Sequence, residues 1–161
     1  MFDAGMGPGE AGLAAVTAQV LAPRRPRGRD RWPLPAARRI GCAADLDAIF
    51  RPHLSGLAQE VFAVALLDTQ RGVIDLGLVS VGILDASLVH PREVFRRAIL
   101  CNAAEIAMAH NHPSGNPEPS PEDIALTRRL VQAGQVIGIT VTDHLILGGP
   151  RYVSLHERGL V

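Results

Sequence analysis

The chain has 161 residues, 47% of them hydrophobic, which is enough for one folded domain with a core and a short extension. Sixteen basic residues balance sixteen acidic ones, and all the basic ones are arginines, which excludes a lysine nucleophile or Schiff base. The two cysteines, Cys42 and Cys101, lie far apart, which excludes a disulfide framework and a cysteine-rich zinc site. This cysteine usage suits a reducing compartment, and we expect a cytoplasmic protein.

Residues 1–39 differ from the rest of the chain in charge and composition. Glycine and proline are frequent there, and arginines cluster at 23–29. Such a segment buries little apolar surface, so we expect 1–39 to be a flexible basic leader and 40–161 to be the folded domain. Basic tails are commonly just solvated, but phosphate contacts with nucleic acid are an alternative role for the leader. The apolar stretch 11–22 is too short to span a bilayer, and we expect no membrane contact.

Hydrophobic patterning predicts the first elements of the domain. A short helix is expected around 43–50, where large apolar residues share one face. Residues 61–67 form an unbroken apolar run, which suits a strand covered on both faces. The segment 73–81 follows a turn and predicts the hairpin partner of that strand, broken by Gly77 and Gly82.

The second half of the domain mixes helices and strands. We expect a helix over 91–102, a strand over 104–110, a helix over 121–133, one or two strands over 138–147, and a strand or turn over 152–161. The order β-β-α-β-α-β-β predicts an α/β domain whose mixed sheet is flanked by helices. The helix residues expected to face the core are Val94, Phe95, Ala98, Ile99, Ile124, Thr127, Leu130 and Val131.

A group of potential metal ligands follows the strand expected at 104–110. His110 and His112 are two residues apart, so their side chains leave the same face of the strand. After ten more residues, which turn the chain into a loop, comes Asp123. Two imidazoles and a carboxylate form a three-ligand site with room for a water, as in catalytic zinc centres. Ser120 and Asp123 also fit a helix N-terminal capping box, but capping leaves the two histidines unexplained.

Several short motifs of this domain occur together. They are His-Asn-His-Pro-Ser-Gly at 110–115, Ser120, Asp123, His-Pro-Arg-Glu at 90–93 and Asp143-His144. The combination resembles the C-terminal domain of the RadC family, a bacterial branch of the JAB/MPN+ (JAMM) metalloprotease-like group. The resemblance covers about residues 42–161. It implies a JAB/MPN fold with a cytidine-deaminase-like architecture.

The resemblance also implies a catalytic role for individual residues. One Zn²⁺ would be bound by His110, His112 and Asp123, with water as the fourth ligand. Glu60, at the head of the strand expected at 61–67, would act as general base toward the water and then as acid toward the leaving amine. Ser120 would donate a hydrogen bond to the oxyanion of the tetrahedral intermediate. The expected protein is therefore a zinc metallopeptidase or isopeptidase that acts on a peptide or protein substrate.

Asp143 and His144 belong to the same family signature but have no settled chemical role. A hydrogen bond that orients a zinc-bound imidazole is one interpretation, and a structural buried pair is the other.

Other functions that the motif suggests fit less well. An HNH nuclease needs a dispersed pattern rather than three adjacent residues, and a zinc deaminase needs a Pro-Cys-x-x-Cys motif. The main alternative is a non-catalytic or DNA-associated module, because the RadC family carries a DNA-repair label. Residues 1–41 are too short and too rich in proline and glycine to supply the DNA-binding segment of complete relatives. Retention of all five positions of the catalytic pattern favours the hydrolase.

Overall fold

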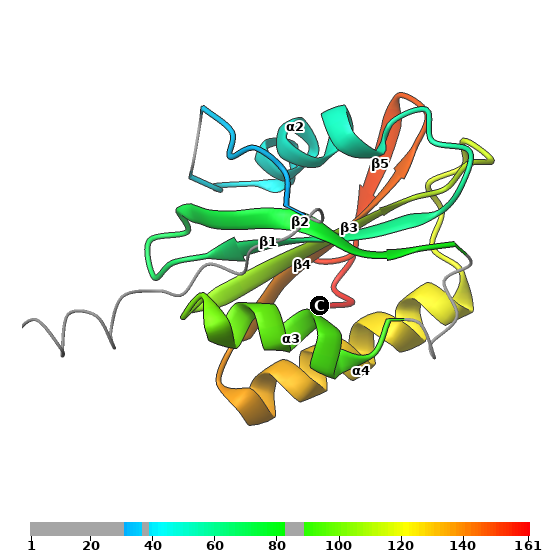
Figure 1. The fold of residues 1–161 in the computed structure, drawn as a ribbon. Helices are drawn as coiled ribbons and strands as arrows, with labels where there is room; N and C mark the ends of the chain where they lie inside the picture. Colours follow the sequence, from blue (N-terminus) through cyan, green and yellow to red (C-terminus); the bar gives the residue numbers. More distant parts are fainter. Residues whose placement is uncertain (1–30, 37–38, 83–88) are drawn as a thin grey trace, which may run out of the picture.

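The computed structural model describes residues 31–36, 39–82 and 89–161 (Figure 1). Those residues form a five-stranded sheet with the strand order β2-β1-β3-β4-β5. The sheet is mixed, because β3 and β4 are parallel and the other neighbours are antiparallel. The strands are β1 (Val61–Leu67), β2 (Val73–Val81), β3 (Glu105–Asn111), β4 (Thr140–Gly148) and β5 (Arg151–Ser154).

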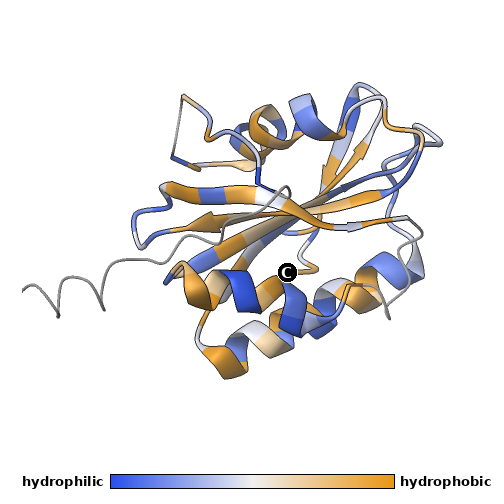
Figure 2. Ribbon diagram, in the orientation of Figure 1, coloured by the Kyte–Doolittle hydropathy of each residue, from blue (hydrophilic) through white to orange (hydrophobic). Residues whose placement is uncertain are grey.

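Helices cover both faces of the sheet (Figure 1). One face packs against α2 (Ala43–Leu54), and the other against α3 (Pro91–Leu100) and α4 (Pro121–Ile137). Every residue of β1 is buried, as its apolar sequence predicts, and apolar residues dominate the sheet in Figure 2. The predicted α/β class and mixed sheet are confirmed. Among the described residues, no helix combines the length and apolar character needed to cross a membrane.

The boundaries of some elements differ from those expected. Helix α2 continues through Pro52 to Leu54, and α4 runs to Ile137 before Gly138 ends it in the left-handed conformation (φ 82°). Strand β2 is not broken at Gly77, which pairs with Val64 of β1. Backbone pairing across the sheet therefore outweighs the weak strand preference of this glycine.

The inward faces of the two later helices are also partly different from the prediction. Ile99 is 58% exposed, and Ile124 and Val131 are only half-buried. The buried stripe of α4 instead starts at Asp123, whose side chain faces the end of the sheet. The remaining buried residues of this helix are Leu126, Thr127, Leu130 and Gly134.

Residues 31–36, which belong to the expected leader, lie against the sheet. The backbone N–H of Trp32 donates to the Leu76 carbonyl of the edge strand β2 (2.9 Å). The indole of Trp32 stacks on His53 of α2 with 4.2 Å between ring centroids. The guanidinium of Arg31 pairs with the buried carboxylate of Asp75 (2.7 Å), which explains why this short segment docks. The basic tract at 23–29 lies outside the described residues.

Candidate metal centre

Three potential ligands meet where β3 ends and α4 begins. His110 is fully buried near the end of β3, His112 follows that strand, and Asp123 lies in the first turn of α4. The Nε2 atom of His110 is 3.0 Å from Nε2 of His112 and 3.2 Å from Oδ1 of Asp123. Nε2 of His112 is 3.3 Å from Oδ2 of the same carboxylate. Two nitrogens and a carboxylate at these distances could hold a divalent metal ion.

The second nitrogen of each histidine has its own partner. Nδ1 of His112 lies 2.7 Å from the main-chain oxygen of Asn116, in the loop between the two halves of the site. Nδ1 of His110 lies 2.8 Å from Nε2 of His144 on the neighbouring strand β4. Partners at Nδ1 fix the orientation of each ring, so both Nε2 atoms face the shared position beside Asp123.

Burial and mutual contact set the charges of the three groups. Burial lowers the pKa of His110, so this imidazole stays neutral as a metal ligand must. The hydrogen bond with Asp123 raises the pKa of the less buried His112. For Asp123, burial alone would raise the pKa, but its close contacts with the His110 and His112 rings hold it far below the usual range. The site therefore contains an ionised carboxylate beside a neutral imidazole.

The predicted capping box at the start of α4 is present. The backbone N–H of Asp123 donates to Ser120 Oγ (3.1 Å), and the backbone N–H of Ser120 donates to Asp123 Oδ2 (2.8 Å). The carboxylate of Asp123 thus caps the helix and faces both histidines at once. Its local role and its role in the metal group are compatible, because a carboxylate has several acceptor positions.

The loop between His112 and Ser120 packs tightly on the end of β4. A Cβ atom at Gly148 would lie 2.5 Å from Pro117 N and 2.7 Å from Gly115 O, so only glycine fits there. The backbone N–H of His112 donates to the Leu147 carbonyl (2.7 Å), which holds the start of the loop to the same strand. Gly148 was not identified from the sequence, where it reads as an ordinary turn residue.

Glu60 immediately precedes β1, the strand that pairs with β3. It is half-buried, and its charge opposes the lowering of the pKa of His110 by burial and adds to the rise at His112, which places the carboxylate near the candidate ligands. Its carbonyl accepts a hydrogen bond from the backbone N–H of Gly82 (2.9 Å). Antiparallel pairing of Phe62 with His110 brings the start of β1 to the end of β3.

Asn111, between the two histidines, holds the backbone on both sides of Glu60. Its side-chain oxygen accepts from the N–H of Val61 (2.8 Å), and its side-chain amide donates to the carbonyl of Gln59 (2.9 Å). In the sequence, Asn111 stands out only as the middle residue of the His-Asn-His motif. That position was the signal by which its structural role could have been found.

Asp143 and His144 point in different directions and have different surroundings. His144 is fully buried, and its Nε2 lies 2.8 Å from Nδ1 of His110. The carboxylate of Asp143 instead accepts from the backbone N–H groups of His144 (2.7 Å) and His156 (3.0 Å) and from the hydroxyl of Ser154 (2.7 Å). Asp143 therefore joins β4 to the C-terminal turn and does not enter the metal group.

Comparison with known proteins identifies the family to which this domain is similar. The family model described as "RadC-like JAB domain" matches residues 40–160. A UPF0758 protein of Symbiobacterium thermophilum is 56% identical over 110 residues, which are 68% of this chain and 47% of that protein. A UPF0758 protein of Listeria welshimeri is 49% identical over 120 residues, 74% of this chain and 54% of that protein.

An archaeal relative extends the comparison. The UPF0758 protein of Methanococcoides burtonii is 44% identical over 124 residues, 77% of this chain and 54% of that protein. The chain thus spans about half the length of the curated relatives it matches. The name UPF0758 assigns no activity to these relatives, and the matched part is the domain that carries the candidate metal centre.

Proposed function

This chain belongs to the family of RadC-like JAB domains, and from that premise we propose that it is a zinc-dependent hydrolase of peptide or isopeptide bonds. The observation that carries the proposal is the convergence of His110 Nε2, His112 Nε2 and the Asp123 carboxylate, all within 4.8 Å of one another. Three protein ligands of the nitrogen and oxygen type are typical of catalytic zinc and leave one coordination position open.

The ligand set fits a divalent metal by its chemistry as well as its spacing. Asp123 is ionised and His110 is neutral, which are the protonation states that metal binding requires. A zinc ion held there would polarise a substrate carbonyl and lower the pKa of a water molecule bound to it.

Glu60 is the proposed proton carrier. Its position beside the two histidines allows its carboxylate to accept a proton from the attacking water and to deliver it to the leaving amine. Asn111 supports this role, since its amide holds the main chain at both neighbours of Glu60.

Ser120 is the proposed donor to the oxyanion. Its oxygen accepts the hydrogen bond of the helix cap from Asp123, and acceptance uses only a lone pair. The hydroxyl hydrogen of Ser120 is therefore available for a second partner, such as the oxygen of a tetrahedral intermediate. Capping and oxyanion binding are compatible in one side chain.

The metal site is tested by metal analysis of chelator-treated protein that has been reloaded with Zn²⁺. Asp123→Ala is expected to lose the one equivalent of zinc that the unaltered protein retains. Asp45→Ala is the matched control, because Asp45 occupies the same capping-box position in α2 but lies outside the metal group. Equal zinc in the Asp123 variant and the unaltered protein would contradict the site.

The catalytic role is tested with Glu60→Gln. This variant is expected to keep its zinc and to lose hydrolysis of peptides and lysine-linked isopeptides, by a factor of about 10² or more. Cleavage is measured by mass spectrometry on a mixed substrate library. Unchanged turnover in the variant would remove Glu60 from the mechanism.

A further inference from the structure

A series of buried hydrogen bonds joins the main chain of Asp123 to Nδ1 of His110 through Thr127 and His144. The hydroxyl of Thr127 donates to the main-chain carbonyl of Asp123 (2.6 Å). The same hydroxyl oxygen lies 2.6 Å from Nδ1 of His144, and Nε2 of His144 lies 2.8 Å from Nδ1 of His110. All three side chains, those of Thr127, His144 and His110, are fully buried.

The position of each proton in this chain follows from counting hydrogens. A carbonyl oxygen only accepts, so the single hydroxyl hydrogen of Thr127 is used on Asp123. Nδ1 of His144, the other close neighbour of that hydroxyl, must therefore carry a hydrogen and donate it. A second proton on His144 would create a charge in a fully buried ring whose nitrogens contact a hydroxyl and an imidazole, which is costly. Its Nε2 is then an acceptor.

We propose that Thr127 and His144 are positioning residues that fix the tautomer of His110, with hydrogen on Nδ1 and the Nε2 lone pair directed at the metal position. Nδ1 of His110 must supply the hydrogen to His144, and because this fully buried ring is neutral, its Nε2 is left without a hydrogen. This series of hydrogen bonds begins at the backbone of one candidate ligand, Asp123, and ends on the ring of another, His110. It therefore couples the start of α4 to the end of β3.

The proposal rests on the proposed metal site but can be tested without a metal. Nitrogen-15 NMR of the metal-free full chain distinguishes the protonated from the unprotonated nitrogen of each histidine ring. The expected spectrum shows hydrogen on Nδ1 of both His144 and His110. Hydrogen on Nε2 of His144 would overturn the proposal, whether or not the protein binds zinc.

Removal of the Thr127 hydroxyl tests the consequence for the site. In Thr127→Val the Nδ1 hydrogen of His144 has no acceptor, so the ring is expected to change tautomer and to place a hydrogen on Nε2 of His110. Competition with a chelator dye should then show zinc bound about 10-fold to 100-fold more weakly. Thr127→Ser keeps the hydroxyl and should restore both the tautomer and the affinity.

Thr142→Val is the matched control, because the hydroxyl of Thr142 also donates to a main-chain carbonyl, that of Ile106 (3.1 Å). It should bind zinc within about 2-fold of the unaltered protein. Equal affinity in Thr127→Val, with folding verified by its thermal midpoint, would overturn the proposal. If the unaltered protein binds zinc no better than Asp123→Ala, the metal site itself fails, and the NMR result still decides the tautomers.

Discussion

Asn111 lies between the residues proposed for metal binding and the residue proposed for proton transfer. Its neighbours on either side are the two candidate histidine ligands, while its own amide is bonded to the backbone around Glu60. One tripeptide thus supplies two candidate metal ligands and holds both neighbours of the proposed proton carrier. A change at Asn111 should separate these two properties.

Asn111→Ala is expected to retain zinc but to hydrolyse the substrate library more slowly. Two buried hydrogen bonds are lost, so the variant should also be destabilised by about 1–3 kcal/mol. Zinc content, turnover and urea denaturation measure the three effects. Gln135→Ala, an exposed amide on α4, is the control and should change none of them. Loss of zinc together with activity would show that Asn111 acts on the ligands instead.

Gly148 supports the site through contact of one backbone with another. Gly148→Ala would place a methyl group against Pro117 and Gly115, so the loop between His112 and Ser120 must shift. We expect weaker zinc binding and a loss of about 1–3 kcal/mol in stability.

Gly149→Ala is the control for the effect at Gly148. Gly149, unlike Gly148, has a left-handed backbone (φ +57°), and the nearest atom to its added Cβ is 3.9 Å away. This variant should lose about 1 kcal/mol through backbone strain and keep its zinc affinity. Equal zinc affinities of the two alanine variants, measured by chelator competition, would show that the loop tolerates the shift.

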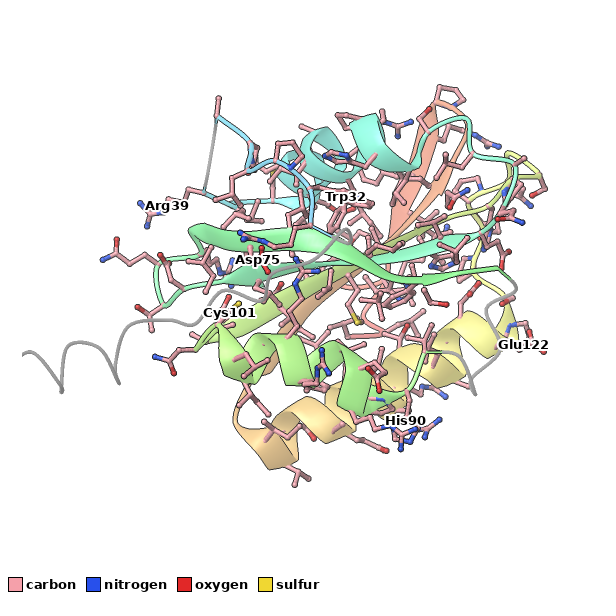
Figure 3. All side chains as sticks on the ribbon, viewed as in Figure 1. Trp32, Arg39, Asp75, His90, Cys101 and Glu122 are labelled. Carbon is pink, nitrogen blue, oxygen red and sulfur yellow. The ribbon has the colours of Figure 1, made fainter. Side chains whose placement is uncertain are left out.

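At the scale of elements, the buried Asp75 of β2 joins three separate segments. It pairs with Arg31 of the docked segment 31–36 and with Arg97 of α3 (2.6 Å), and the thiol of Cys101 lies 3.8 Å away. Trp32, Asp75 and Cys101 are labelled in Figure 3. Burial alone would raise the pKa of Asp75, but the hydrogen bonds and charges of Arg97 and Arg31 hold it below its usual value. One buried carboxylate on the edge strand β2 thus binds both the segment 31–36 and helix α3.

A lowered pKa means that Asp75 stabilises the fold only while it is ionised. Its contribution is complete above the unfolded value of about 3.9 and is lost as pH falls through the lower folded value. Asp75→Asn should cost about 3 kcal/mol near neutral pH, and its difference from the unaltered protein should narrow below about pH 4. Urea denaturation near neutral pH and below about pH 4 measures this difference in the free energy of unfolding.

The exposed pair of Glu118 and Arg158 provides the control for Asp75. Glu118→Gln should leave the urea midpoint nearly unchanged, because exposed ion pairs contribute little. A difference between Asp75→Asn and the unaltered protein that stays constant down to acid pH would contradict the assigned role of the charge.

The types and order of the elements were predictable because hydrophobic period and turn residues are local properties. Helix faces were less predictable, since the burial of α4 is set by Asp123 and by the sheet end it faces rather than by apolar residues alone. The docking of residues 31–36 depends on Asp75, more than forty positions away, and local composition carries no information about such a partner. Strand β2 continues through Gly77 because its backbone pairs with β1, a contact that is not local in sequence.

At the scale of the whole molecule, a metal ion in the candidate site would join the sheet to the helical layer. Its three ligands come from the end of β3 and the start of α4. At a zinc concentration about a hundredfold above Kd, binding should add about 2.7 kcal/mol, a rise in Tm on the order of 10 °C. Differential scanning calorimetry with zinc and with a chelator measures the shift. The same shift in Asp123→Ala would mean that zinc binds elsewhere.

The candidate ligands that the structure brings together were predictable from the sequence because they are close along the chain. The spacing of His110, His112 and Asp123 was visible as a pattern, whereas Glu60 was assigned only through the family resemblance. Its position depends on the pairing of Phe62 with His110, which brings distant parts of the chain together. Periodicity shows which face of a strand is buried, but it does not show which strand lies beside it.

The parallel pair β3 and β4, joined through α4, contains most of the candidate site. The candidate ligands, the capping serine, the Thr127 and His144 hydrogen bonds and Gly148 all lie between residues 105 and 148, in this single β-α-β unit. Glu60 lies outside it, on the other side of a long intervening stretch. A single substitution at Glu60 would therefore remove the proposed proton carrier and leave the candidate metal-binding unit intact, so the two proposed properties are separable in this fold.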